Sequence, residues 1–356
     1  MPSVAMSRRT AGTHPSVTVL LGDPSLADPT KPTGRFAPED FDSIARLRKA
    51  LEGLGRYDLR WLDQHETLLA ELARQRPAFV LNLCDTGYRN QPTRELHVAA
   101  LLELLEIPYS GAPPAAMATC YDKGLVTAVA RGMGIPTPTE HHYETAQDAL
   151  GRVGRMLLPA LIKPNHGDGS VGITERAIVR TRPEARAYLA WLGETLPGRD
   201  VLVQEYLPGP EYSVGLVGNP EHGLEVLPIL EPDFSALPAG SAPICCYESK
   251  AVPDSPYWSG IAYRGARLGP ATRERLAADS RRLFARLGLR DYARVDFRAD
   301  AAGTIKLMEV NPNPAWAYDG KLALMAELGG RGYPEFLQTL IGAALRRVAG
   351  GASQAA

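Results

Sequence analysis

Three oxygen-bearing side chains near the C-terminal end of the chain have the types and spacing of a metal site. Asp296 lies in the segment ARVDFRA, and Glu309 and Asn311 lie in MEVNPNP. Each segment is typical of a β-strand, and the DAAG between them is typical of a tight turn in which Gly303 adopts a positive φ. Carboxylate and amide oxygens suit a hard cation. The hairpin therefore predicts a Mg²⁺ site, and an ordinary hairpin with surface acids is the alternative.

A lysine followed by glycines gives a second candidate for chemistry, phosphate binding. Lys163 ends the apolar segment LLPALIK, and Gly167, Gly169 and Gly172 follow it. Glycine lets backbone N–H groups approach a phosphate closely, and a lysine ammonium adds positive charge. The lysine precedes the glycines, so this is not a Walker A loop. A segment of this kind alone is more often an ordinary flexible loop. Other segments of the chain are therefore needed to show whether it binds phosphate.

Several segments together resemble the ATP-grasp ligases, and the wider chain resembles their D-alanine–D-alanine ligase branch. They include R-x-D and E-x-N of the hairpin, K-P-x-x-x-x-G-S-V-G beginning at Lys163, and VLVQEYLPGPEYSV; the resemblance covers roughly residues 17–345. It implies an ATP-grasp fold of α/β and α+β class, with a doubly wound N-terminal α/β domain and two lobes that sandwich ATP. It also implies that a carboxylate is phosphorylated to an acyl phosphate, which an amine attacks to give an amide, ADP and phosphate.

The resemblance also implies roles for individual residues. Lys163 would contact the α/β phosphates, Ser170 would close over the β/γ phosphates, and Lys250 would grip the γ-phosphate. Arg294 matches the arginine that stabilises the tetrahedral transition state, which suits a planar cation that stays charged. Family members often carry Glu where this chain has Gln204, whose carboxamide still accepts a hydrogen bond from the adenine amino group. The implied residues are, for ATP, Lys123, Lys163, Gly169, Ser170, Gln204, Glu205, Tyr206, Leu207, Glu211 (ribose) and Lys250; for catalysis, Arg294, Lys250 and Ser170; and for Mg²⁺, or alternatively Mn²⁺, Asp296, Glu309 and Asn311.

The expected amino-acid pocket matches the family least. Where the family has a Glu after the first strand, this chain has GDPSLAD, in which only Ala27 or Asp28 lies near. The Tyr that follows the phosphate lysine in the family is Ala251 here, and the Ser-Leu that binds the second substrate falls near Gly320 and Lys321. These changes favour a larger or more acidic partner than alanine. The expected substrate residues are Asp28, Asp85, Arg89, Trp316, Gly320 and Lys321.

The resemblance and its departures together predict an ATP-dependent amide or peptide ligase. It would join an amino acid, a peptide or a natural-product carboxylate to an amino acid. The alternatives are a genuine D-alanine–D-alanine ligase of cell-wall synthesis, another ATP-grasp activity such as a kinase or carboxylase, an ATP-binding protein without catalysis, and a non-enzymatic scaffold. Small-molecule amino acids or peptides are the expected partners, and a homodimer is expected because family members are commonly dimers.

The elements that must position these residues can be read from the apolar periodicity. Strands are expected at 16–21, 57–62 and 78–83, alternating with helices at 41–54, 66–76 and 94–105. We therefore expect a flexible tail at 1–15, an N-terminal α/β substrate domain at 16–118, a central ATP-grasp lobe with the phosphate loop at 119–205, and a C-terminal lobe with the metal site at 206–348. An extended stretch is expected at 244–252, and helices at 271–287 and 334–348.

Composition excludes several classes of function. The 356 residues carry a net charge of −1, which gives no general basic field for nucleic acid or a membrane surface. No apolar run approaches a membrane span, and the N-terminal segment lacks the apolar core of a signal peptide. The four cysteines form no C-x-x-C pair. Reduced thiols and a cytoplasmic location are therefore expected.

Overall fold

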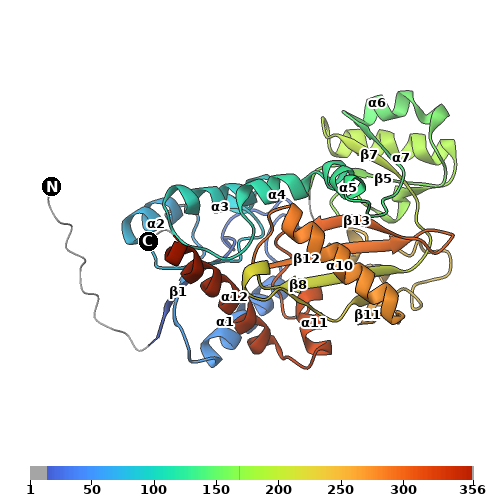
Figure 1. The fold of residues 1–356 in the computed structure, drawn as a ribbon. Helices are drawn as coiled ribbons and strands as arrows, with labels where there is room; N and C mark the ends of the chain where they lie inside the picture. Colours follow the sequence, from blue (N-terminus) through green and yellow to red (C-terminus); the bar gives the residue numbers. More distant parts are fainter. Residues whose placement is uncertain (1–13, 168, 355–356) are drawn as a thin grey trace.

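A computed structural model describes residues 14–167 and 169–354 (Figure 1). Of the tail predicted at 1–15, residues 1–13 lie outside the described residues. The described chain forms a three-stranded parallel sheet, a four-stranded antiparallel sheet and a six-stranded antiparallel sheet, in that order from the N-terminus. The four-stranded sheet lies at one end of the elongated molecule, and the three-stranded sheet lies toward the other.

Helices cover both faces of the parallel sheet, which confirms the doubly wound N-terminal prediction. Strands β1 (Ser16–Leu20), β2 (Asp58–Leu62) and β3 (Val80–Asn82) are arranged β2-β1-β3. Val17 and Val19 pack toward α1 (Pro38–Gly53) and the C-terminal helix α12 (Tyr333–Gln354). Leu20, on the opposite face, packs in a cluster with residues of α2 (Leu68–Gln75) and α3 (Glu95–Leu104). Because the side chains of β1 alternate between two faces that are both buried, a separate layer of helices packs on each face of the sheet.

The central sheet carries the expected lysine strand. Its order is β4-β7-β5-β6, from β4 (Glu140–Tyr143), β5 (Ala160–Pro164), β6 (Ile178–Val179) and β7 (Val201–Glu205). Helices α6 (Ala146–Gly151) and α7 (Arg182–Thr195) pack against it through a core of their own. Lys163 therefore stands on an inner strand, paired with Leu202 of β7.

The C-terminal sheet contains the predicted hairpin. Strand β12 (Tyr292–Ala299) pairs with β13 (Ile305–Asn311) on one side and with β8 (Glu211–Val217) on the other. Gly303, in the connecting turn, has a φ of 83°, as expected. The sheet is completed by β9 (Glu225–Val226), β10 (Leu230–Asp233) and β11 (Ala262–Gly265). Helices α10 (Pro270–Arg286) and α11 (Lys321–Leu328) contact β8 of this sheet. Helix α9 (Pro256–Gly260), which follows the short turn α8 (Glu248–Ala251), packs through Tyr257 in the core of the central sheet.

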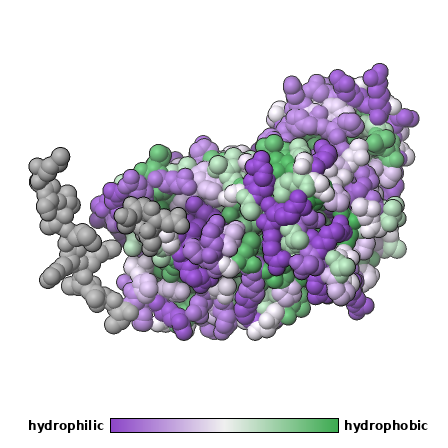
Figure 2. Space-filling model, in the orientation of Figure 1, coloured by the Kyte–Doolittle hydropathy of each residue, from purple (hydrophilic) through white to green (hydrophobic). Residues whose placement is uncertain are grey.

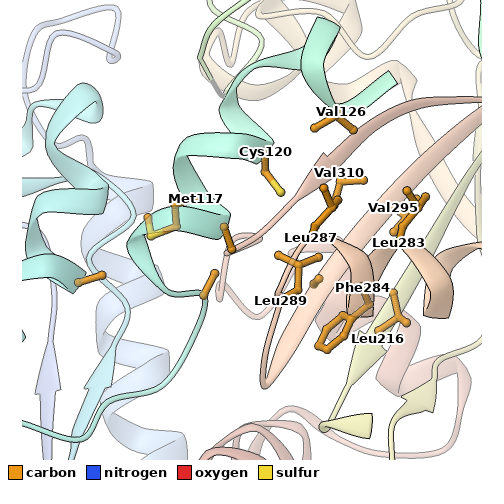
Figure 3. Packing of buried hydrophobic residues seen from close by; sticks show 14 of the residues in the cluster. Met117, Cys120, Val126, Leu216, Leu283, Phe284, Leu287, Leu289, Val295 and Val310 are labelled. Carbon is orange, nitrogen blue, oxygen red and sulfur yellow. The ribbon is translucent and has the colours of Figure 1, made fainter. Parts of the chain in front are cut away.

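Two helices that follow the N-terminal domain in sequence pack on the C-terminal sheet instead of the central one. Met117 and Cys120 of α4 (Pro114–Tyr121) and Val126 of α5 (Lys123–Gly132) share a buried cluster with Leu287 and Val310 (Figure 3). The boundary expected between residues 118 and 119 falls inside α4, whereas the boundary expected after residue 205 falls at the end of β7.

The extended stretch predicted at 244–252 is wrong in its second half, where Glu248–Ala251 forms the single helical turn α8. The Tyr247 N–H donates to the carbonyl of Ile173, which fixes the start of the turn beside the glycine-rich loop. The N–H groups of Lys250 and Ala251 then donate to the Tyr247 carbonyl. The polar segment Glu248-Ser249-Lys250 satisfies its backbone locally, so a strand partner is not needed.

A buried ion pair joins the helix α12 to segments of the N-terminal and C-terminal parts of the chain. Asp291, which is fully buried, accepts hydrogen bonds from Nε and Nη2 of Arg347, each at 2.8 Å. It also accepts from the Gly111 N–H at 3.0 Å and from Asn219 Nδ2 at 3.0 Å. Arg347 Nη2 in turn donates to the carbonyl of Tyr109 at 2.7 Å. The carboxylate therefore holds together α12, the segment at Gly111 and the segment that follows β8.

The visible face of the molecule is largely hydrophilic or neutral, and the hydrophobic residues on it occur in small groups (Figure 2). Within residues 14–167 and 169–354, no helix combines the length and apolarity needed to cross a membrane.

Candidate active site

A cleft between the central and C-terminal sheets gathers most of the residues that the sequence singled out. It encloses about 930 Å³ of space free of atoms, including the solvent at its mouth. Strands β5, β7, β8, β12 and β13 contribute to its walls, together with the starts of α5 and α11 and the turn α8. The predicted residues that line it are Lys123, Lys163, Ser170, Gln204, Glu205, Tyr206, Leu207, Glu211, Lys250, Arg294, Asp296, Glu309 and Lys321.

The two-residue period of β12 separates the cleft from the core. Arg294, Asp296 and Arg298 line the cleft, whereas Val295 and Phe297 are buried in the main hydrophobic cluster. Sequence reasoning missed Arg298, although its position, two residues after Asp296, places it on the same face of the strand.

Lys163 is buried at the base of the cleft, where Gln204 is its hydrogen-bond partner. Its Nζ donates to Gln204 Oε1 at 3.3 Å, and Gln204 Nε2 donates to Glu140 Oε2 at 2.9 Å. Glu140, which the sequence did not reveal, therefore explains the amide: a Glu at position 204 would face another carboxylate. Burial, together with the neighbouring Lys123, lowers the pKa of Lys163 to about 8 against the opposing effects of Glu309 and Glu140.

Three hydrogen bonds hold the glycine-rich loop, two donated by lysine side chains and one accepted by a backbone carbonyl. Lys123 Nζ donates to the carbonyl of Gly167, and Lys250 Nζ donates to Ser170 Oγ at 2.8 Å. Ser170 Oγ donates to the Cys245 carbonyl at 3.2 Å. The side chain of Ser170 and those of Lys123 and Lys250 thus line the same cleft and are tied to the glycine-rich loop. Such a cleft suits a chain of phosphates.

The predicted metal residues lie together on the hairpin. Asp296 and Glu309 are opposite each other across β12 and β13, and Asn311 Nδ2 donates to Asp296 Oδ2 at 3.1 Å. Burial raises the pKa of Asp296, but Arg294 and Lys321 lower it more, to about 2, so the carboxylate is ionised at neutral pH. The set offers two carboxylates and an amide, and the described residues contain no cluster of three His, Cys, Asp or Glu that could hold a metal. This donor set fits a cation such as Mg²⁺, which takes its other ligands from phosphate and water.

Lys321, which the sequence placed in the amino-acid pocket, lies in this cleft instead. Its Nζ donates to Ser213 Oγ at 3.0 Å and lies 3.5 Å from Glu211 Oε1. Glu211 Oε2 also lies 3.4 Å from Arg298 Nη1. The expected ribose carboxylate is therefore held between two cations at the back of the cleft.

The other expected substrate residues are not all brought together. Asp85 and Trp316 line a second, smaller cavity, together with Glu95 and Tyr292, which the sequence analysis missed. Its space free of atoms, about 210 Å³, includes the solvent at its mouth. Tyr292 precedes Arg294 by two residues on β12, so this cavity lies along the strand face that leads away from the lysine-lined cleft. Trp316 Nε1 donates to the Leu83 carbonyl at 2.9 Å, which fixes the indole at the end of β3.

The remaining three expected substrate residues line neither cavity. Arg89 is exposed, and its N–H donates to His65 Nδ1 at 2.7 Å. Asp28 is buried, and its Oδ1 accepts from the Thr30 N–H and hydroxyl at 2.9 and 2.6 Å. Gly320 precedes α11 in a turn so tight that a Cβ would lie 3.0 Å from two carbonyl oxygens. Its absent side chain therefore has a structural reason.

Comparison with known proteins agrees with this geometry. A family model described as "D-ala D-ala ligase C-terminus" matches residues 133–342, which is more than half of the 356-residue chain. The D-alanine–D-alanine ligase of Aquifex aeolicus is 28% identical over 296 residues, covering 83% of this chain and 92% of that protein. "Uncharacterized protein y4sG" of Sinorhizobium fredii is 29% identical over 307 residues, covering 80% of this chain and 85% of that protein.

Solved structures share the fold. The D-alanine–D-alanine ligase of Bacillus anthracis complexed with ATP has a TM-score of 0.67 at 21% identity, over 94% of this chain and 97% of that chain. The VanG D-Ala:D-Ser ligase of Enterococcus faecalis has a TM-score of 0.68 at 17% identity, over 93% of this chain and 99% of that chain. These likenesses confirm the predicted ATP-grasp fold. With a family model matched over most of both ATP-grasp lobes, the chain belongs to the D-alanine–D-alanine ligase family of ATP-grasp enzymes.

Proposed function

We propose that the protein is an ATP-dependent ligase that joins the carboxyl group of an amino acid, a peptide or a natural-product acid to the amine of an amino acid. The observation that carries this proposal is the meeting of Lys123, Lys163 and Lys250 with the Asp296–Glu309 pair in one cleft between the two antiparallel sheets. Ammonium groups suit the phosphates of a nucleotide, and the paired acids suit its magnesium ion.

ATP fits the cleft in one direction. The strand end at Gln204–Leu207 offers backbone groups and the ring of Tyr206 to adenine, and Glu211 lies next along the chain for the ribose. The phosphates then follow Lys163, Lys123 and the loop at Ser170 toward Lys250. This order is the one that the family resemblance implies.

The reaction uses these residues to position charge. Lys250 and Ser170 orient the γ-phosphoryl group while a substrate carboxylate oxygen attacks its phosphorus and ADP leaves. The amine nitrogen then attacks the acyl carbon, and the tetrahedral intermediate collapses to the amide as phosphate leaves. Arg294 stabilises the oxyanion of that intermediate, because its guanidinium keeps its charge and is held at the cleft by Asp296. When bound, Mg²⁺ neutralises phosphate charge.

The substrates are expected to differ from two D-alanines. The cavity beside Asp85, Glu95 and Trp316 has acidic groups for an amine and an indole for an apolar side chain. A site that binds polar groups of one substrate discriminates strongly against others. D-Alanine should therefore give little ADP release, and another amino acid or a peptide should give clear release.

A panel assay tests this proposal. Purified protein with Mg-ATP is incubated with D- and L-amino acids and dipeptides, singly and in pairs, while ADP and phosphate are measured and amide products are identified by mass spectrometry. Synthesis of D-alanyl-D-alanine at ordinary ligase rates would instead identify the protein as a D-alanine–D-alanine ligase. A phosphorylated or carboxylated product without an amide would instead support a kinase or a carboxylase.

The glycine-rich loop should respond to nucleotide. Gly167, Gly169 and Gly172 have positive φ angles, and Cβ atoms at the first two would meet nothing within 4 Å. We expect amide hydrogens of residues 169–172 to exchange quickly in the free protein and at least about tenfold more slowly with a non-hydrolysable ATP analogue. Hydrogen exchange with mass spectrometry measures this, with β1 as the internal control. Equal protection in both states would count against a phosphate-covering loop.

Nucleotide affinity should fall as the pH rises through the pKa of Lys163. In the free protein this pKa is about 8, so the side chain is mostly an ammonium at pH 7 and mostly neutral at pH 9. Because phosphate binds the ammonium, the affinity for ADP should weaken by up to about tenfold per pH unit above the pKa. Calorimetric titration at pH 7, 8 and 9 measures it.

The control for that titration is Lys163→Arg, whose guanidinium stays charged across this range. Its affinity for ADP should change less with pH than that of the natural protein. The same pH dependence in both proteins would assign the effect to another group.

A further inference from the structure

The carboxylates of Asp296 and Glu309 differ in the hydrogen bonds that they accept. Each oxygen of an ionised carboxylate accepts about two hydrogen bonds. Oδ1 of Asp296 accepts from Ser213 Oγ at 2.6 Å and from Arg294 Nε at 3.1 Å. Its Oδ2 accepts from Arg294 Nε at 3.0 Å and from Asn311 Nδ2 at 3.1 Å. Three donors therefore occupy both oxygens of Asp296, since the Arg294 Nε–H is shared between them, and a metal ion would have to displace one of these donors.

Glu309 is the opposite case. It is only half-buried and lines the cleft, and within residues 14–167 and 169–354 no group donates a hydrogen bond to its carboxylate. Asn311 donates a hydrogen bond from its Nδ2 to Asp296, and its Oδ1 remains as an oxygen ligand for a metal ion. Asn311 lies two residues from Glu309 on the same face of β13. A hard cation therefore finds its open protein ligands at Glu309 and Asn311.

An ammonium already stands beside Asp296. Lys321 Nζ lies 4.0 Å from Asp296 Oδ1 and 3.5 Å from Glu211 Oε1, and its side chain is 12% exposed. The cations of a two-metal site lie about 3.5–4 Å apart, with carboxylates shared between them. A second dication bound to Asp296 Oδ1 would share this oxygen with a buried ammonium that already lies 4.0 Å from it, and like charges so close together repel each other.

Resting on the proposed function, we infer that the cleft binds a single divalent cation, through Glu309 and Asn311, and that the Lys321 ammonium takes the charge-neutralising place of a second cation beside Asp296. Lys321 reaches this place because it is the first residue of α11, which directs its side chain past Ser213 into the cleft. The role of Asp296 is then to hold Arg294 and Lys321 in position.

Counting bound Mn²⁺ tests the inference without relying on turnover. Free Mn²⁺ is measured by electron paramagnetic resonance while it is titrated into protein saturated with ADP. The natural protein should bind one Mn²⁺ per complex. Lys321→Met, which keeps the length of the side chain but removes its charge, should bind a second. Lys306→Met, which removes another shielded ammonium paired to Glu205 and Asp300, should still bind one.

Two further variants separate the two carboxylates. Glu309→Gln should weaken Mn²⁺ binding by at least about tenfold, whereas Asp296→Asn should change it less than about threefold. These variants keep the inference open to test even if Lys321→Met does not fold, which its thermal melting will show.

Each outcome bears on the inference. Two Mn²⁺ in the natural protein would overturn it and leave the proposed ligase activity standing. One Mn²⁺ in both the natural protein and Lys321→Met, or an Asp296→Asn variant as impaired as Glu309→Gln, would also overturn it. Failure of ADP itself to bind would overturn the proposed function and this inference together.

Discussion

Glu309→Gln should reduce the rate of ADP release by at least about 10³-fold while leaving the melting temperature unchanged. The substitution removes the charge of the open metal ligand, and a bound cation supplies several kcal/mol of transition-state stabilisation. The fold should tolerate the change because Glu309 is half-buried and its carboxylate accepts no hydrogen bond from the described residues. Steady-state kinetics with the best substrate pair and a thermal melt measure the two halves of this prediction.

The matched control for this variant is Glu274→Gln, which neutralises an acid whose side chain is 75% exposed on α10. It should retain full activity. Chelation with EDTA should abolish turnover of the natural protein, and excess Mg²⁺ should restore it. Full activity of Glu309→Gln, or undiminished activity in EDTA, would sink the metal assignment.

Arg347→Leu should lower the free energy of unfolding by about 3–5 kcal/mol, because it leaves a buried carboxylate without its cation. The Asp291 side chain is 0% exposed and would keep only neutral hydrogen-bond partners, among them the Gly111 N–H and Asn219. Urea denaturation followed by tryptophan fluorescence measures the loss.

Arg346→Leu is the control for this second variant, because it changes the neighbouring arginine on the exposed side of α12. A surface substitution of this kind changes stability by about 0.5 kcal/mol or less. Equal destabilisation by the two variants would show that the loss comes from the helix in general and not from the pair with Asp291.

Local signals in the sequence were enough for most of the fold. The hairpin at Asp296 and Glu309 was predictable because its strands alternate and its turn contains a glycine. Asp122 caps α5 through a hydrogen bond from the Leu125 N–H at 2.8 Å, as its position before the helix indicates. The presence of Lys123 and Lys250 in the cleft was predictable only from the family resemblance, because nothing local distinguishes Lys123 from an exposed helix lysine.

Long-range contacts account for what the sequence did not reveal. Glu140 and Gln204 are 64 positions apart and meet because β4 and β7 are neighbours in the sheet. Lys321 is 108 positions from Ser213, and its spacing from Glu309 suggested a substrate contact where the structure has an ion pair. Such pairs depend on how strands are ordered in the sheets, which the periodicity of single segments does not encode.

The packing of α12 on the first sheet bears on how a cell makes this protein. Leu337 and Ile341 complete the hydrophobic cluster that contains Val17, Val19 and Leu81. At about 5–20 residues per second, a ribosome needs tens of seconds to reach α12 after it has released β1. Throughout that time one face of the earliest strands lacks its cover and is available to chaperones. A chain that stopped before α12 would therefore leave this face of β1 and β3 uncovered and open to proteases.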